Sequence, residues 1–223
     1  MSDGAIIADG FAAQRLHMVE THLRSRGLRD LRVLAAMERV PRHLFVPADR
    51  HAEAYADHPV IIGEQQTISQ PYMVAAMLEA AEIQPTDKVL EVGTGSGYQA
   101  VLLAELAAEV FTVERYLSLA QSAEIRLKEL GYERVKVSVG DGTAGLAESA
   151  PYDVIVVAAA APRAPQPLLD QLREGGRLVI PIGDLEEQLL HVFRKTAQGV
   201  EDHRLFGCKF VPLVGKFGFS PGE

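Results

Sequence analysis

The sequence predicts an α/β fold with a doubly wound, mostly parallel sheet, an N-terminal helical extension and a C-terminal antiparallel strand pair. Three observations support this prediction. Segments of strand and helix character alternate between residues 88 and 182, which is typical of parallel strands joined by right-handed crossovers. A glycine-rich loop follows the first of these strands. The run at residues 152–157 is almost wholly apolar, as expected for a parallel strand covered on both faces.

The size of the chain favours one domain. Its 223 residues are 48% apolar and 23% charged, which is enough for one well-buried core. We therefore expect a single domain over residues 1–223. Within it, residues 1–62 form a helical extension and connector, and residues 63–223 form the α/β core.

Charge and cysteine content bound the partners and the compartment. The net charge of −8 disfavours a phosphate backbone, so no nucleic-acid partner is expected. A single cysteine, Cys208, leaves no disulfide framework and suits a reducing compartment. Residues 1–14 lack the basic residues of a secretory signal, and the longest apolar run, 154–161, is too short for a bilayer. We expect a cytoplasmic monomer without a membrane partner, whose first ~12 residues are disordered.

Two helices are expected ahead of the sheet. The first spans residues 12–26 and stops at Gly27, and the second is capped by Asp30 and ends before Pro41. Apolar residues recur at helical spacing in both. The residues expected at this spacing are Leu16, Val19 and Leu23 in the first helix, and Leu31, Leu34 and Met37 or Glu38 in the second.

An irregular region should connect these helices to the core. Residues 40–47 are bracketed by prolines and should form an ordered connector, and residues 55–62 read as irregular. His43, His51 and His58 fall in this region, but their spacing fits no familiar metal site and no acidic or cysteine partner is in register. We interpret them as solvated or core-edge histidines and expect no metal.

A dense polar loop at residues 63–71 precedes a helix at residues 72–81. Ser69 could simply cap that helix, since Pro71 is well placed in a first turn. A cap needs one hydroxyl, however, and does not explain why Gln65, Gln66 and Thr67 crowd the same loop. A binding or catalytic role for the loop therefore stays open beside the capping role.

The glycine loop at residues 93–97 joins a strand at 89–92 to a helix at 99–106. Gly93, Gly95 and Gly97 would let a ligand lie against bare backbone at the helix N-terminus. Position 98 is Tyr, so the dinucleotide-binding spacing is absent. Instead Glu91 stands at the end of the strand, which suits a cationic amino-acid ligand such as S-adenosylmethionine. The alternative is an ordinary strand–glycine–helix turn.

Two further acidic residues follow successive strands. Glu114 ends the strand at 109–114, about 20 residues past Gly93, the distance expected of a ribose-binding acid. After a helix at 117–130 and a strand at 135–139, Asp141 could accept a hydrogen bond from an adenine amine, with Gly142 giving the base room. Each acid alone could be a surface or turn residue. Together with Glu91 they fall where an open α/β sheet binds its ligand.

The remaining elements complete the sheet. After the strand at 152–157 we expect a helix at 168–172, a turn at 174–176 and a strand at 177–182. Alternating residues 188–195 and 205–213, joined by the polar stretch 196–204, should form the closing antiparallel pair.

From about residue 31 to residue 215, the chain resembles the protein-L-isoaspartate O-methyltransferases. The general methyltransferase signals lie at residues 91–97, 114 and 140–142, and more specific ones at residues 40–46, 66–71, 150–153, 159–162, 175–181 and 210–213. The chain departs from the family where Gln65 replaces a common glycine and where Ala158 replaces a frequent threonine.

The resemblance implies a Rossmann-like methyltransferase fold and a repair activity. The cofactor would be S-adenosylmethionine, its product S-adenosylhomocysteine, and the partners damaged proteins or peptides that contain L-isoaspartyl residues. By the same resemblance, Ser69 would orient the attacking carboxylate, and Ile68, Ser69 and Val214 would bind the peptide. The cofactor-binding residues would be Gln66, Thr67, Glu91, Gly93, Gly95, Gly97, Glu114, Asp141 and Gly142.

Two other functions remain possible, and residues 210–214 have a second interpretation. The protein could methylate another acceptor, such as a tRNA base or a small molecule, because this fold serves many acceptors. It could also bind S-adenosylmethionine without turnover. Residues 210–214 could be an ordinary sheet strand instead of a peptide contact.

Overall fold

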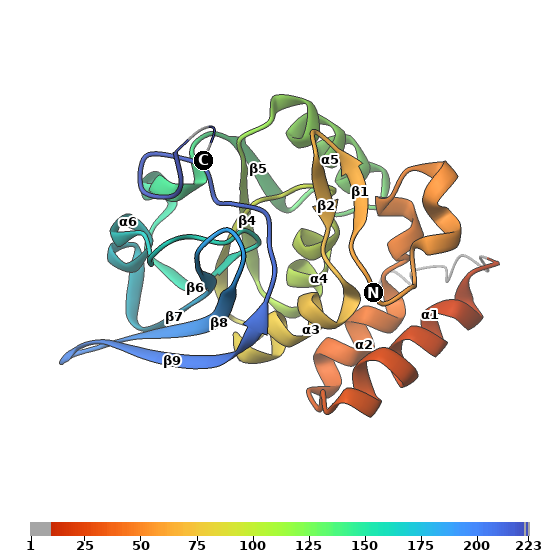
Figure 1. The fold of residues 1–223 in the computed structure, drawn as a ribbon, viewed down its shortest axis with the longest axis horizontal. Helices are drawn as coiled ribbons and strands as arrows, with labels where there is room; N and C mark the ends of the chain where they lie inside the picture. Colours follow the sequence, from red (N-terminus) through yellow and green to blue (C-terminus); the bar gives the residue numbers. More distant parts are fainter. Residues whose placement is uncertain (1–9, 221, 223) are drawn as a thin grey trace.

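The computed structural model describes residues 10–220 and residue 222. It contains a seven-stranded sheet with the strand order β5-β4-β3-β6-β7-β8-β9 and a separate two-stranded sheet, β1-β2. Figure 1 shows helices α1 and α2 at one end of the molecule and the long β8–β9 hairpin at the other. The strands are β1 Val60–Gly63, β2 Gln66–Ile68, β3 Lys88–Val92, β4 Glu109–Glu114, β5 Val135–Val139, β6 Tyr152–Val157, β7 Leu172–Gly183, β8 Gln188–Thr196 and β9 Gly199–Cys208. The expectation of disorder at the N-terminus falls, as far as residue 9, outside the described residues.

The five strands β3 to β7 are parallel, and β8 and β9 close the sheet as antiparallel strands. The chain moves outward from β3 through β4 to β5, then returns to place β6 on the other side of β3. This reversal between β3 and β6 creates the crevice in which open α/β sheets bind ligands. The predicted fold class is confirmed.

The helices cover the two faces of the sheet unequally. Alternate strand residues point to opposite faces, so Val89 packs in one apolar cluster and Leu90 in the other. Helices α2 to α5 contribute to the first cluster, and the short α6 to the second. The α-helices are α1 Ala12–Met18, α2 Leu31–Arg39, α3 Pro71–Ala80, α4 Tyr98–Leu106, α5 Leu117–Glu129 and α6 Gln166–Asp170. Shorter helical turns are η1 Val19–Leu23, η2 Arg24–Arg26, η3 Arg42–Phe45, η4 Ala48–Glu53, η5 Gly142–Ala144 and η6 Ala147–Ser149.

The N-terminal helices form where expected, but two predicted core residues were wrong. Gly27 ends the first helical segment with φ +100°, and the Asp30 side chain accepts hydrogen bonds from the first turn of α2. Leu16 is 53% exposed, because the buried face passes instead through Arg15 and Met18. Leu31 is 71% exposed, because it is the first residue of α2 and the packed stripe begins two residues later.

The expected irregular stretch and polar loop contain a hairpin, β1–β2. Sequence patterning misses it because the two strands have only four and three residues. Its turn is also unusual, since Glu64 and Gln65 adopt φ values of +47° and +57° that normally select glycine. The division expected between residues 62 and 63 falls within β1, and the single-domain organisation stays a proposal.

Gln65 holds a left-handed φ of +57° although it carries a side chain, so the turn carries backbone strain. Replacing Gln65 with glycine should raise the free energy of unfolding by about 0.5–1 kcal/mol, because relief of the left-handed conformation outweighs the added entropy of the unfolded chain. Urea unfolding followed by circular dichroism would measure the change. Gln65→Ala keeps a Cβ and is the matched control, so an equal gain in that variant would contradict the explanation.

The C-terminal strand pair is present, but its second strand was misplaced. Strand β9 spans Gly199–Cys208, whereas the expected strand was 205–213 and the expected link 196–204. The first half of β9 is an exposed edge with charged residues, so it lacks the alternation that marks a half-buried strand. Residues 210–214 leave the sheet and touch it through a bridge between Ala160 and Pro212. The expected turn at 174–176 lies inside β7, where the pairing with β6 shifts register.

Within the described part of the chain, no helix has both the length and the apolar character needed to cross a bilayer.

Candidate active site

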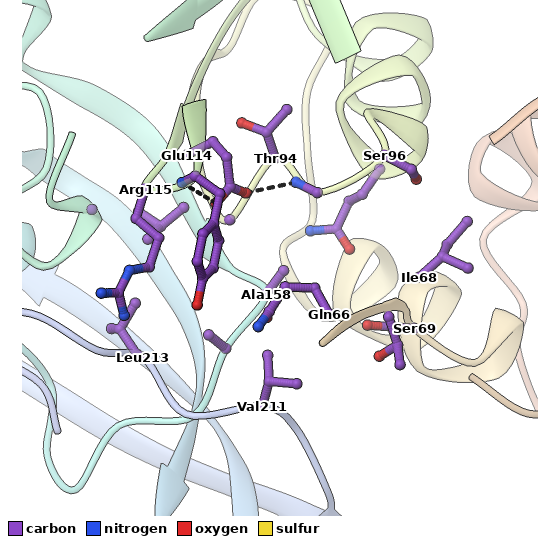
Figure 2. A pocket seen from close by; sticks show the side chains of 18 of the residues that line it. Gln66, Ile68, Ser69, Thr94, Ser96, Glu114, Arg115, Ala158, Val211 and Leu213 are labelled. Atoms are coloured by element: carbon purple, nitrogen blue, oxygen red, sulfur yellow. Dashed lines mark hydrogen bonds between the residues drawn. The ribbon is translucent and has the colours of Figure 1, made fainter. Parts of the chain in front are cut away.

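A crevice opens at the carboxyl ends of β3, β4 and β6, at the reversal of strand order. About 800 Å³ of space not filled by atoms lies within it, part of which is open solvent at the mouth. Figure 2 shows Ile68 and Ser69 on one wall and Glu114 and Arg115 on the opposite wall. The sequence-predicted residues that line it are Gln66, Thr67, Ile68, Ser69, Gly93, Gly95, Glu114, Gly142 and Val214.

The glycine loop supplies a floor of bare backbone. Gly93, Gly95 and Gly97 have φ values of +96°, +52° and +87°, which strain any other residue. Gly97 begins α4 and has no side-chain cap, so the amino end of that helix lies directly behind the loop. Gly142 meets a different constraint, since an added Cβ would lie 2.5 Å from the Val92 side chain.

Glu114 ties the glycine loop to the end of β4. One carboxylate oxygen accepts a hydrogen bond from the Gly95 amide at 2.9 Å, and the other accepts one from the Tyr116 amide at 3.0 Å. The residue is buried yet lines the crevice (Figure 2), so remaining lone pairs can meet a ligand hydroxyl.

Glu91 does not reach the crevice as expected for a strand-end acid. Its side chain is fully buried within β3, where one oxygen accepts a hydrogen bond from Thr112 Oγ1 at 2.5 Å. The other oxygen has no hydrogen-bond partner among the described residues. Burial raises the pKa of Glu91 to about 8, with the nearby Glu114 adding to the shift.

Asp141 likewise does not line the crevice. Its carboxylate accepts hydrogen bonds from the Thr143 amide, the Thr143 hydroxyl and the Lys216 amide, which fixes the turn after β5 to the C-terminal segment. These bonds lower the pKa of Asp141 against the opposing effect of desolvation. Its expected contact with an adenine amine stays a prediction.

The Ser69 loop forms the wall opposite Glu114. Helix α3 begins after Gln70 and has no side-chain cap, so capping does not account for Ser69. A second pocket continues from the first, and Thr67, Ser69, Ala158 and Val211 line both. Ser69 therefore stands at the junction of two pockets.

The histidines lie apart from these pockets. His43 is buried and stacks on Phe11 with ring centroids 4.3 Å apart, and His51 meets the same cluster edge-on. In residues 10–220 and 222 no three metal-binding side chains gather in one group.

Comparison with known proteins identifies the family. The family model described as protein-L-isoaspartate(D-aspartate) O-methyltransferase (PCMT) matches residues 13–218. A protein-L-isoaspartate O-methyltransferase of Koribacter versatilis is 58% identical over 214 residues, covering 96% of this chain and 96% of the relative. The chain belongs to the protein-L-isoaspartate(D-aspartate) O-methyltransferase family. A second relative, from Methanoculleus marisnigri, is 55% identical over 213 residues, and the match covers 96% of this chain and 97% of the relative.

Solved structures of the family share this fold. One protein-L-isoaspartate O-methyltransferase superposes with a TM-score of 0.81 and 28% identity, covering 92% of this chain and 67% of the solved one. Another, from Plasmodium falciparum, has a TM-score of 0.77 and 28% identity, covering 88% and 96% of the two chains. It was solved in complex with S-adenosyl-L-homocysteine.

Several crevice residues of this methyltransferase family member were missed by the sequence reasoning. Gln99 is the most informative, because its side chain is only 7% exposed and its amide nitrogen has no hydrogen-bond partner among the described residues. A buried amide left unpaired in a pocket wall is suited to a ligand acceptor. The available sequence signal was a polar residue in the first turn of α4, directly ahead of the apolar run 100–104. The other missed lining residues include Thr94, Ser96, Arg115, Tyr116 and Ala158.

The buried Glu91 predicts a pH-dependent stability. A carboxyl whose pKa rises on folding favours the folded state most below its ordinary value near 4.5, and loses that contribution as pH approaches 8. Between pH 5 and 8 the wild type should therefore lose stability relative to Glu91→Gln, by up to about 1.4 kcal/mol per pH unit. Urea unfolding at several pH values would measure the difference. Glu109→Gln, on the exposed start of β4, is the control, and a pH-independent difference for Glu91→Gln would contradict the prediction.

Proposed function

We propose that this protein transfers the methyl group of S-adenosylmethionine to the α-carboxylate of L-isoaspartyl residues in damaged proteins and peptides. The observation that carries the proposal is the junction of two pockets at Ser69, in a chain that belongs to this enzyme family. One pocket suits a nucleoside cofactor and the other an acceptor chain. The product ester would then collapse to a succinimide, whose hydrolysis returns some normal aspartate and so begins repair.

The crevice fits the cofactor on its own chemistry. Its glycine floor admits close approach of a ligand, and Glu114 offers acceptors for ribose hydroxyls. The unpaired Gln99 amide can donate to a ligand carboxylate. Gln66 and Thr67 would cover the ligand from the facing wall. When bound, S-adenosylmethionine supplies a methyl group on a sulfonium, which is an activated leaving group.

The residues of this chain would act by positioning the acceptor. The acceptor carboxylate is already an anion, so no strong general base is needed, and orientation with exclusion of water should provide most of the rate. Ser69 would donate a hydrogen bond that orients the carboxylate. Within the described chain no histidine lines either pocket, which agrees with a mechanism that needs no acid–base dyad.

The second pocket would receive the peptide on either side of the isoaspartyl residue. Its wall includes Tyr72, Met73, Phe206 and Phe210, a largely apolar surface that tolerates varied side chains. Ile68 and the segment through Val214 would complete the peptide site beside Ser69. Action as a monomer without a nucleic-acid partner also stays part of the proposal.

A labelled-cofactor assay tests the function against its rivals. The protein is incubated with methyl-labelled S-adenosylmethionine and a matched pair of peptides, one isoaspartyl and one aspartyl, with tRNA in a parallel reaction. Base-labile label on the isoaspartyl peptide alone is expected. Label on tRNA would favour a different acceptor, and cofactor binding without transfer would favour a non-catalytic protein. Either result would overturn the proposal.

A further inference from the structure

Arg42 is a buried cation that the proposed function does not yet use. It begins η3, in the segment 40–46 that resembles the family without having an assigned role. Arg42 is 0% exposed, a degree of burial that it shares with Glu91. Burial lowers the pKa of the guanidinium below its ordinary value.

The partners of Arg42 are main-chain carbonyls and an aromatic ring. Nε donates to the Ala54 carbonyl and Nη2 to the Ser69 carbonyl, both at 2.7 Å. The guanidinium carbon lies 4.9 Å from the centroid of the Tyr98 ring, and Tyr98 lines the crevice. In the described residues Nη1 has no hydrogen-bond partner and no carboxylate forms a direct ion pair with Arg42, although Tyr98, Tyr55 and Asp57 partly offset the effect of burial on its charge.

Arg177 shows how a buried arginine is used when its role is structural. It too is buried, at 7% exposure, and donates to the Ala81 carbonyl at 2.7 Å. Unlike Arg42, it forms an ion pair with Asp87 at 2.8 Å that neutralises its charge. Burying an unpaired charge is expensive, so the arrangement at Arg42 calls for a benefit that an ordinary core contact does not give.

The benefit is that Arg42 fixes the position of the Ser69 carbonyl. Ile68 is the last residue of β2 and pairs with Val60, while the Gln70 carbonyl accepts the first helical hydrogen bond of α3, from Val74. Ser69 therefore lies between sheet and helix, where neither ladder holds its carbonyl. Because the peptide unit is planar, fixing this carbonyl fixes the plane that follows Ser69 and restricts the direction of its side chain.

We propose that Arg42 is the positioning residue of the Ser69 loop: through the Ser69 carbonyl and the Tyr98 ring it holds the Ser69 hydroxyl at the junction of the two pockets. The proposal rests on the proposed function, since it assigns Arg42 to the same reaction. Arg42 lines neither pocket, so it would act through Ser69. A second brace supports the loop, as the Gln70 side chain donates to the Asp57 carbonyl at 3.0 Å.

The first test compares Arg42→Met and Arg42→Lys with the control Arg177→Met. In each variant kcat and KM for an isoaspartyl peptide, the Kd of S-adenosyl-L-homocysteine and Tm are measured, with kinetics well below Tm. Arg42→Met should lower kcat about 50-fold or more while the Kd changes less than about threefold. Arg42→Lys should recover only part of the rate, because an ammonium cannot reproduce the planar fork. Arg177→Met should lower Tm with kcat within about twofold of wild type.

A double-mutant cycle separates positioning from a general loss of structure. If Arg42 acts through Ser69, Arg42→Met should lower kcat by less than about threefold in a Ser69→Ala background. Full additivity of the two losses, an unchanged kcat, or a Kd that weakens in parallel with kcat would each overturn the proposal. If Arg42→Met does not fold, Arg42→Lys is judged by the same criteria. A wild type that transfers no methyl group would overturn the function itself, whereas an active wild type with unaffected Arg42 variants would overturn only the role of Arg42.

Discussion

Replacing Ser69 with alanine should lower kcat for an isoaspartyl peptide about 100-fold and leave the affinity for S-adenosyl-L-homocysteine within about threefold of wild type. Ser69 stands at the junction of the two pockets, so its hydroxyl can hold the attacking carboxylate in line with the donor carbon. The cofactor is held mainly by the glycine loop and Glu114, which the substitution does not touch. Steady-state kinetics and calorimetric titration would measure the two quantities.

Ser122→Ala is the matched control for Ser69→Ala. Ser122 lies on the exposed face of α5, where its hydroxyl donates to the Ser118 carbonyl, away from both pockets. Its loss should leave kcat unchanged. Because Ser69 does not cap α3, Ser69→Ala should also cost little stability. A kcat that stays within twofold of wild type would remove Ser69 from the mechanism.

The parts of the fold that the sequence predicted are those in which burial alone dictates the element. Strands β3, β4 and β6 are largely buried runs, and their bounds were close to those expected because both faces of the sheet are covered there. The β1–β2 hairpin and the edge strand β9 were missed or misplaced for a common reason. Their conformation depends on pairing partners and on a turn of non-glycine residues, neither of which leaves a periodic apolar signal.

The sequence predicted which backbone segments form the crevice better than it predicted which side chains face it. The glycine spacing and the acid at 114 mark positions along the chain, and the parallel sheet brings these positions together. Whether a carboxylate faces a pocket depends on its hydrogen-bond partners. Glu91 is held by Thr112 inside the sheet and Asp141 by its own turn, so both lie at the predicted strand ends without lining the crevice.

Glu114→Gln should weaken the affinity for S-adenosyl-L-homocysteine about 30-fold, while kcat at saturating S-adenosylmethionine stays within about threefold of wild type. The two carboxylate oxygens accept from the Gly95 and Tyr116 amides, so an amide in their place must turn an N–H toward one of these donors. One charge-assisted hydrogen bond of about 1.5–3 kcal/mol is then lost, and the glycine floor is no longer held at the end of β4. An affinity ratio of this size corresponds to about 2 kcal/mol.

Glu109→Gln supplies the comparison, because Glu109 begins the same strand but is exposed at its far end. Calorimetric titration of both variants with S-adenosyl-L-homocysteine should show the loss only for Glu114→Gln. The division of effects is the stronger test: Glu114 should act on the cofactor and spare turnover, whereas Ser69 should act on turnover and spare the cofactor. If Glu114→Gln lowered kcat as much as affinity, the two walls of the crevice would not have separate tasks, and the assignment of one wall to the cofactor and the other to the acceptor would fail.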